Sequence, residues 1–98
     1  MNASVNNLAF IEKGFKLEQN IPNPVSGQTI INYSTSGQEN ILIKLFSSEG
    51  KEVAVLVNER KSKGDYSVVL DLSKYAAGTY FYQMQAGNVS ETKKLIVE

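Results

Sequence analysis

Carboxylates are the side chains of this sequence most suited to acid–base chemistry, because the chain has no histidine and no cysteine. The usual general base, the Ser-His triad and thiol nucleophiles are thereby excluded, as are disulfides and zinc–thiolate sites. Asp65 and Asp71 lie at the two ends of one expected strand, and Glu49 and Glu52 lie in an expected turn. A carboxylate pair can cleave glycosidic bonds when burial raises the pKa of one member. Since turns and strand ends are solvated, we interpret all four as surface carboxylates and predict no enzyme activity.

The glycines give no sign of a cofactor site. A phosphate-binding loop gathers its glycines in one short segment, whereas here they are spread one per turn, at Gly37, Gly50, Gly64, Gly78 and Gly87. This spacing is typical of turns that use the conformational freedom of glycine. The acidic spacing of a calcium loop is also missing from the sequence. We therefore expect neither a cofactor nor a metal.

The aromatic run Tyr80-Phe81-Tyr82 has two interpretations. Rings on a solvent-facing sheet would stack on a sugar and make a carbohydrate-binding site. In the interpretation that we favour, Tyr80, Tyr82 and Met84 face the core and Phe81 covers a sheet edge. Tyr80 follows a glycine at a strand start, so we expect its hydroxyl to bond back to the preceding loop like a tyrosine corner.

Charge and hydropathy argue against two classes of partner. The chain of 98 residues carries 10 basic and 10 acidic side chains, so its formal net charge is zero. Nucleic-acid binding needs a basic surface that neutralises phosphates. The densest basic run, 60–63, is flanked by Glu59 and Asp65, and we interpret it as a solvated loop. No stretch approaches the ~20 apolar residues of a membrane span, so we expect no membrane insertion.

Alternation of apolar and polar residues predicts strands along nearly the whole chain. Residues 1–14 are weakly patterned and are expected to be a linker or the tail of an upstream region, although 8–11 would make a short strand. A first half-buried strand is predicted where Phe15 and Leu17 alternate with Lys16 and Glu18. The next segment, 19–24, contains two prolines, which lack backbone donors and keep their neighbours extended. We expect it to be a rigid edge segment or a switch between sheets.

Regular turn signals separate the remaining strands and define the expected fold class. About seven short strands with apolar-in, polar-out alternation predict an all-β, immunoglobulin-like antiparallel β-sandwich. The sandwich is expected to form one domain over 15–98. The predicted core includes Ile43, Leu45, Val53, Val55, Tyr80 and Leu95.

Four ordered blocks of sequence carry a family resemblance. The first two are Leu17-Glu18-Gln19-Asn20-Ile21-Pro22-Asn23-Pro24 and Thr29-Ile30-Ile31-Asn32-Tyr33. The third is an alternating strand that enters the turn at Gly50 and returns as a valine strand. The fourth comprises Asp71-Leu72-Ser73, Ala77-Gly78-Thr79-Tyr80-Phe81-Tyr82, Gly87 and Lys93-Lys94. In this order the blocks resemble the type A C-terminal sorting domain of type IX secretion system cargo proteins. The resemblance assigns the sorting motif to Leu17, Asn20, Pro22, Asn23, Pro24, Gly50, Gly78, Tyr80, Gly87, Lys93 and Lys94.

The resemblance implies a non-catalytic secretion signal that directs an attached N-terminal cargo protein across the outer membrane of Bacteroidetes. The implied partners are the outer-membrane secretion translocon and a sortase-like protease. The implied location is the periplasm in transit, then the cell surface or the medium. Because the blocks spread from Leu17 to Lys94, we predict that the signal is a folded surface. Lys93 and Lys94 are adjacent, so at least one should face solvent, where a translocon would recognise it together with the terminal carboxylate.

Two other functions stay open at this stage. The first is an accessory carbohydrate- or protein-binding fibronectin-like module, which would need a row of exposed aromatic rings, and only Phe81 is a good candidate. The second is an adhesin or spacer domain, which would need neighbouring domains on both sides. A parent reading frame that stops at Glu98 would favour the sorting domain over the spacer.

Overall fold

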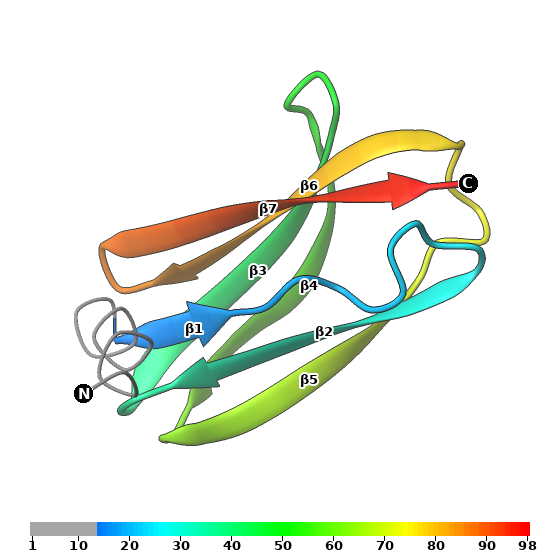
Figure 1. The fold of residues 1–98 in the computed structure, drawn as a ribbon. Helices are drawn as coiled ribbons and strands as arrows, with labels where there is room; N and C mark the ends of the chain where they lie inside the picture. Colours follow the sequence, from blue (N-terminus) through cyan, green and yellow to red (C-terminus); the bar gives the residue numbers. More distant parts are fainter. Residues whose placement is uncertain (1–13) are drawn as a thin grey trace, which may run out of the picture.

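The computed structural model describes residues 14–98, so the short strand considered at 8–11 lies outside the described residues. Seven strands form over this range (Figure 1). None of the elements described there is a helix long and apolar enough to cross a membrane. The strands are β1 (Phe15–Leu17), β2 (Gln28–Thr35), β3 (Glu39–Ser47), β4 (Glu52–Lys61), β5 (Gly64–Asp71), β6 (Gly78–Ala86) and β7 (Val89–Val97).

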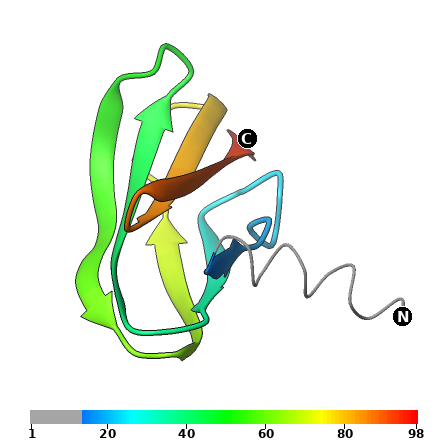
Figure 2. The same cartoon turned by 90° about the vertical axis from the view of Figure 1, so that its left-hand side faces the viewer.

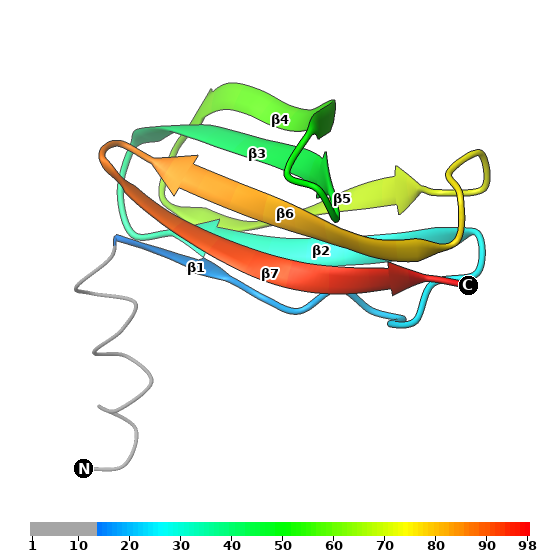
Figure 3. The same ribbon diagram turned by 90° about the horizontal axis from the view of Figure 1, so that it is seen from above.

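Two antiparallel sheets pack face to face as the layers of a sandwich (Figure 2, Figure 3). The three-stranded sheet has the order β1-β2-β5, and the four-stranded sheet has the order β4-β3-β6-β7. Every neighbouring pair within the sheets is antiparallel. The pairing of β2 with β5, of β3 with β6 and of β6 with β7 is the immunoglobulin-like arrangement. The predicted fold class is therefore confirmed.

Glycine turns close the two hairpins of the four-stranded sheet. The β6–β7 hairpin turns at Gly87, with φ of 63°, and sets Ala86 opposite Val89. The β3–β4 hairpin turns through Gly50, with φ of 85°. Both angles lie in the left-handed region, which strains any residue that carries a Cβ atom. These turns fix β7 and β4 at the two edges of the sheet.

The core lies between the sheets and is built from alternate residues of the strands. Ile43, Leu45 and Leu95 are fully buried, as predicted, and Ile31 faces them from the three-stranded sheet. Tyr80 is half-buried and packs against this cluster. Its ring therefore covers one end of the core.

The prediction that Val53 and Val55 lie in the core is wrong. Their side chains are 38% and 49% exposed. The pairing of β4 with β3 shifts register twice within 43–46, and each shift inserts one extra residue into β4. The first bulge reverses the alternation of β4, and the second contains Val53. As a result Val57 and Ala54 face the core instead.

The favoured interpretation of the aromatic run is confirmed for the core and wrong for the edge. Tyr82 and Met84 are fully buried. The Tyr80 hydroxyl donates to the carbonyl oxygen of Ala76 at 2.7 Å, which is the expected tyrosine corner. Phe81 does not cover a sheet edge, because β6 is an interior strand of the four-stranded sheet. Its half-buried ring lies on the outer face, since Phe81 alternates with the inward Tyr82.

Candidate functional site

The segment between β1 and β2 carries the first sequence block and joins the two sheets. This connecting segment, residues 18–27, first runs along the three-stranded sheet, where Ile21 and Ile30 exchange backbone hydrogen bonds of 3.0 and 2.9 Å. It then reaches the four-stranded sheet, where Val25 forms a parallel bridge to Val97. The expected switch between sheets is therefore confirmed, and Figure 1 shows this loop beside the end of β7.

Asn20 is the hub of the connecting segment and is only 2% exposed. Its Nδ2 donates to the carbonyl oxygen of Pro22 at 3.0 Å and to Oγ1 of Thr29 at 3.1 Å. Its Oδ1 accepts from Nε2 of Gln19 at 2.7 Å. Thr29 donates in turn to the Pro22 carbonyl at 2.9 Å. Because both ends of the buried amide are satisfied, Asn20 fixes the bend of the segment without an unpaired polar group.

The Tyr82 hydroxyl connects this hub to the centre of the opposite sheet. It accepts from the Asn20 backbone N–H at 2.8 Å and donates to the Glu18 carbonyl at 2.7 Å. Burial raises the pKa of Tyr82 to about 12, although the Asn20 hydrogen bond acts in the opposite direction. The hydroxyl therefore stays protonated at neutral pH and holds the connecting segment at two points, as acceptor and as donor.

Three further hydrogen bonds fasten the connecting segment to β7. Nε2 of Gln19 donates to the Lys94 carbonyl at 2.7 Å, and Oδ1 of Asn23 accepts from the Ile96 N–H at 2.9 Å. The Val25 N–H donates to the Ile96 carbonyl at 2.7 Å. These bonds occupy edge groups of β7 that another strand would otherwise pair with. We call residues 18–27 together with 93–97 the stitched surface.

The remaining predicted residues of the first block lie beside this surface. Leu17 is a core residue with 3% of its surface exposed. Pro22 and Pro24 are exposed, and the peptide bonds that precede them are both cis. Pro22 contributes its carbonyl oxygen to the hub, and Pro24 leads into the bridge formed by Val25.

The two lysines of the last block face opposite sides of β7. Lys94 is exposed on the outer face opposite Phe81, which confirms that at least one of the two faces solvent. Lys93 lies on the inner side opposite Tyr82 and is half-buried, with its Nζ 3.2 Å from a carboxylate oxygen of Glu91. An inward-pointing charge on an edge strand is a common protection against further strand pairing.

The predicted glycines divide between the two ends of the sandwich. Gly78 begins β6 opposite Val97 and so lies at the same end as the stitched surface. Gly50 lies in the β3–β4 hairpin, and Gly87 closes the far end of β6. The structure therefore brings the first block, Gly78 and Lys94 together, and it leaves Gly87 at the opposite end.

Sequence reasoning missed two members of this site. Alternation along its strand predicts that Tyr82 lies in the core but indicates no role for its hydroxyl. A buried tyrosine needs a hydrogen-bond partner, and this requirement is the signal that could have found it. Thr29 lies on the inward face of β2 with Ile31 and Tyr33 and is 1% exposed, so its hydroxyl likewise needs a buried partner.

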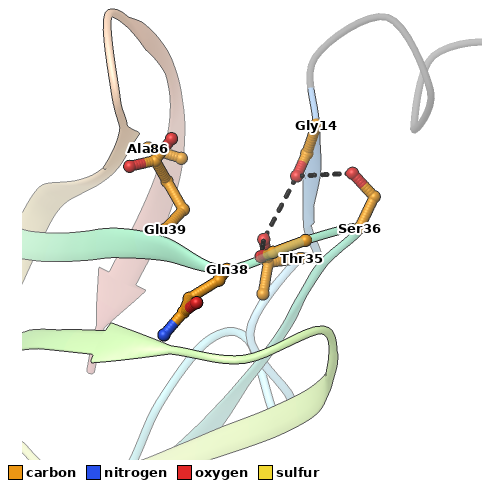
Figure 4. A pocket seen from close by; sticks show the side chains of 7 residues that line it. Gly14, Thr35, Ser36, Gln38, Glu39 and Ala86 are labelled. Atoms are coloured by element: carbon orange, nitrogen blue, oxygen red, sulfur yellow. Dashed lines mark hydrogen bonds between the residues drawn. The ribbon is translucent and has the colours of Figure 1, made fainter.

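A polar hollow of about 140 Å³ lies where the described residues begin (Figure 4). The hydroxyls of Thr35 and Ser36 donate to the Gly14 carbonyl at 3.3 and 3.2 Å. Glu39 is the one carboxylate among the residues that line this hollow. The two hydroxyls therefore anchor the start of β1, and the described residues that line the hollow include no carboxylate pair.

The carboxylates considered for catalysis are all exposed. Glu52 pairs with Lys44 at 2.9 Å. A backbone hydrogen bond from Ser73 lowers the pKa of Asp71, whereas a general acid needs a raised one. Within residues 14–98, no group of three or more His, Cys, Asp or Glu side chains is placed to hold a metal ion.

The strand order defines the class of this protein as a small immunoglobulin-like sandwich. The family model described as "Secretion system C-terminal sorting domain" matches residues 20–98. The chain belongs to this family, as its ordered blocks predicted. The match begins at the hub residue Asn20 and includes the whole of β7. No curated protein matches the chain at a significant level.

Solved structures support the fold. The chain is similar to part of dimeric latent PorU from Porphyromonas gingivalis, with a TM-score of 0.68 and 19% identity over 85% of this chain. It spans only 9% of that chain. It is also similar to the sulfur carrier protein SoxY from Chlorobium limicola f thiosulfatophilum, with a TM-score of 0.51 and 12% identity over 100% of this chain and 99% of that one. At these identities both likenesses concern the fold alone.

Proposed function

We propose that residues 15–98 are a non-catalytic sorting signal that directs an attached cargo protein across the outer membrane by the type IX secretion system. Residues 1–14 serve as the link to this cargo. The observation that carries the proposal is the stitched surface, in which the first and last motif blocks meet through hydrogen bonds between Asn23, Gln19 and β7. Such a surface exists only in the folded domain.

The proposed route has two stages. The cargo crosses the inner membrane by the general export route, and the sorting domain folds in the periplasm. The outer-membrane translocon then binds the folded domain, and a sortase-like protease separates it from the cargo at the cell surface. The anchoring of Gly14 by Thr35 and Ser36 supports a boundary between domain and linker at this point.

Lys94 is the charge that we assign to recognition. It is exposed, and its backbone carbonyl is held by Gln19, so the lysine projects from a fixed point of the stitched surface. Lys93 is engaged with Glu91, so we assign it to protection of the β7 edge. Replacing Lys94 with Gln should therefore reduce export more than replacing Lys93 with Gln.

Secretion of a reporter tests the function. Residues 1–98 are fused to the C-terminus of a periplasmic reporter in a host with a type IX system and in a strain without its translocon. We expect release into the medium only where the translocon is present. Retention of the fusion inside cells of both strains would contradict the sorting function.

One observation favours the accessory binding module as a second candidate. Phe46 and Phe81 are directly opposite each other on the outer face of the four-stranded sheet, beside an open hollow of about 340 Å³ that Gln83 and Thr92 also line. Two neighbouring rings form a better platform for a sugar than the single ring expected from the sequence. Oligosaccharide binding that is lost in Phe81→Ala, together with retention of the reporter, would establish this alternative.

A further inference from the structure

The four edge strands of the sandwich differ in how well they are protected over residues 14–98. β7 is fastened to the connecting segment, β4 is interrupted by two bulges, and β1 has only three residues. β5 has eight residues in continuous register with β2 and forms the other edge of its sheet. In Figure 1 it lies along the rim of the molecule. It is therefore the edge most suited to accept another strand.

The hydrogen-bond pattern shows which β5 groups point outward. Ile30 exchanges both of its backbone bonds with Ile21, and the Asn32 carbonyl accepts from Glu18. These β2 residues thus use their backbone groups on the side away from β5. Because bonding alternates along an antiparallel ladder, their β5 partners Val69 and Ser67 direct their N–H and C=O groups to the open side. That edge offers the donors and acceptors that β-strand addition requires.

The side chains along this edge have a definite charge pattern. Asp65, Ser67, Val69 and Asp71 are exposed, with Val69 at 60%. An apolar centre thus lies between two carboxylates that are six residues apart on the same face. On the other face of β5, which points toward the core, Val68 is only half-buried.

This pattern disfavours pairing between two copies of the chain. Suppose that two copies of β5 pair in antiparallel orientation and overlap over the whole of 65–71. Asp65 of each copy then lies opposite Asp71 of the other, so two carboxylates meet at each end of the pair. Like charges directly opposite each other are destabilising. A strand with basic residues at those two positions would meet attraction at both ends instead.

We propose that the β5 edge is a docking site for an extended strand of a partner protein that carries two basic residues six positions apart, with an apolar residue between them. The strand adds to the three-stranded sheet in antiparallel orientation. Its backbone pairs with Ser67 and Val69, and its basic side chains lie opposite Asp65 and Asp71. The site is on a different sheet edge from the stitched surface, and it does not depend on the proposed sorting function.

Binding of synthetic peptides to the whole chain tests the site. The probe is the capped peptide Lys-Thr-Val-Thr-Val-Thr-Lys, and its matched control has Glu at both ends. We expect amide shifts in NMR spectra to concentrate at Ser67 and Val69, and binding of the Glu peptide to be weaker by about tenfold or more. Equal affinity for both peptides, no binding of the Lys peptide, or shifts centred on another strand would overturn the proposal.

A charge exchange separates the site from general attraction between peptide and protein. Asp65→Lys should weaken binding of the Lys peptide by about tenfold and should favour a peptide that has Glu at its last position, opposite residue 65. Glu49→Lys makes the same change of charge in the β3–β4 loop and should leave the preference unchanged. Loss of binding in both variants alike would show attraction without a site and would contradict the proposal.

Discussion

Replacing Tyr82 with Phe should destabilise the domain far more than the loss of one oxygen suggests. The ring is fully buried, and its hydroxyl serves the Asn20 N–H at 2.8 Å and the Glu18 carbonyl at 2.7 Å. Phe keeps the packing but leaves the buried Asn20 donor without its partner. One unsatisfied buried donor and one lost hydrogen bond together cost about 2–4 kcal/mol.

Tyr80→Phe is the matched control for this prediction. Tyr80 lies on the same strand, and its hydroxyl makes a single bond to the Ala76 carbonyl at 2.7 Å in an exposed position. Water can replace that partner, so the change should cost about 1 kcal/mol or less. Urea unfolding followed by tyrosine fluorescence and circular dichroism gives both free energies of unfolding, provided that the slopes agree.

A second readout locates the damage. In Tyr82→Phe, amide exchange should accelerate first over 18–27 and 93–97, because the stitched surface opens before the core does. If Tyr82→Phe were no more destabilising than Tyr80→Phe, the hydroxyl would not be the link between the connecting segment and the opposite sheet, and the reasoning on the hub would be wrong.

Three further predictions concern the core, a turn and pH. Leu45→Ala should cost about 2–5 kcal/mol, whereas Val55→Ala should cost less than about 0.5 kcal/mol, as measured by urea unfolding. Gly50→Ala should cost about 1–2 kcal/mol because φ is positive there, and Gly37→Ala, where no positive φ occurs, should be close to neutral by the same assay. The pKa of Tyr82 is raised from 10.0 to about 12 on folding, so the stability that this tyrosine contributes is complete below pH 10 and is lost as the pH rises toward 12. When the pH is raised from below 10 to above 10, the urea midpoint of unfolding should therefore fall less in Tyr82→Phe than in the unaltered chain.

The parts of the fold that the sequence predicts are those with one clear alternation. In β6, inward Tyr82 and Met84 are separated by the more polar Gln83, so the buried face was assigned correctly. β4 lacks such a contrast, because apolar residues fill both faces over 53–57. Periodicity then has no means of detecting a bulge, and the valines were assigned to the wrong face.

The candidate site was predictable as a set of residues but not as a geometry. The resemblance pointed to Asn20 and Asn23, yet the partner of the Asn20 N–H is a hydroxyl 62 positions away, and that of Asn23 is 73 positions away. Contacts at such separation depend on how the two sheets pack, which no local pattern encodes. The charge pattern of β5 was visible in the sequence, but its place at a free edge follows only from the strand order.

The claim that the sorting signal is a folded surface is tested most directly by comparing two reporter fusions. One carries residues 1–98, and the other carries only the β6–β7 hairpin, 78–98, which has Lys93 and Lys94 but lacks the connecting segment. Release from cells with a type IX system is measured for both at equal expression. We expect release of the whole-chain fusion and retention of the hairpin fusion. Equal release of the two would contradict a folded signal.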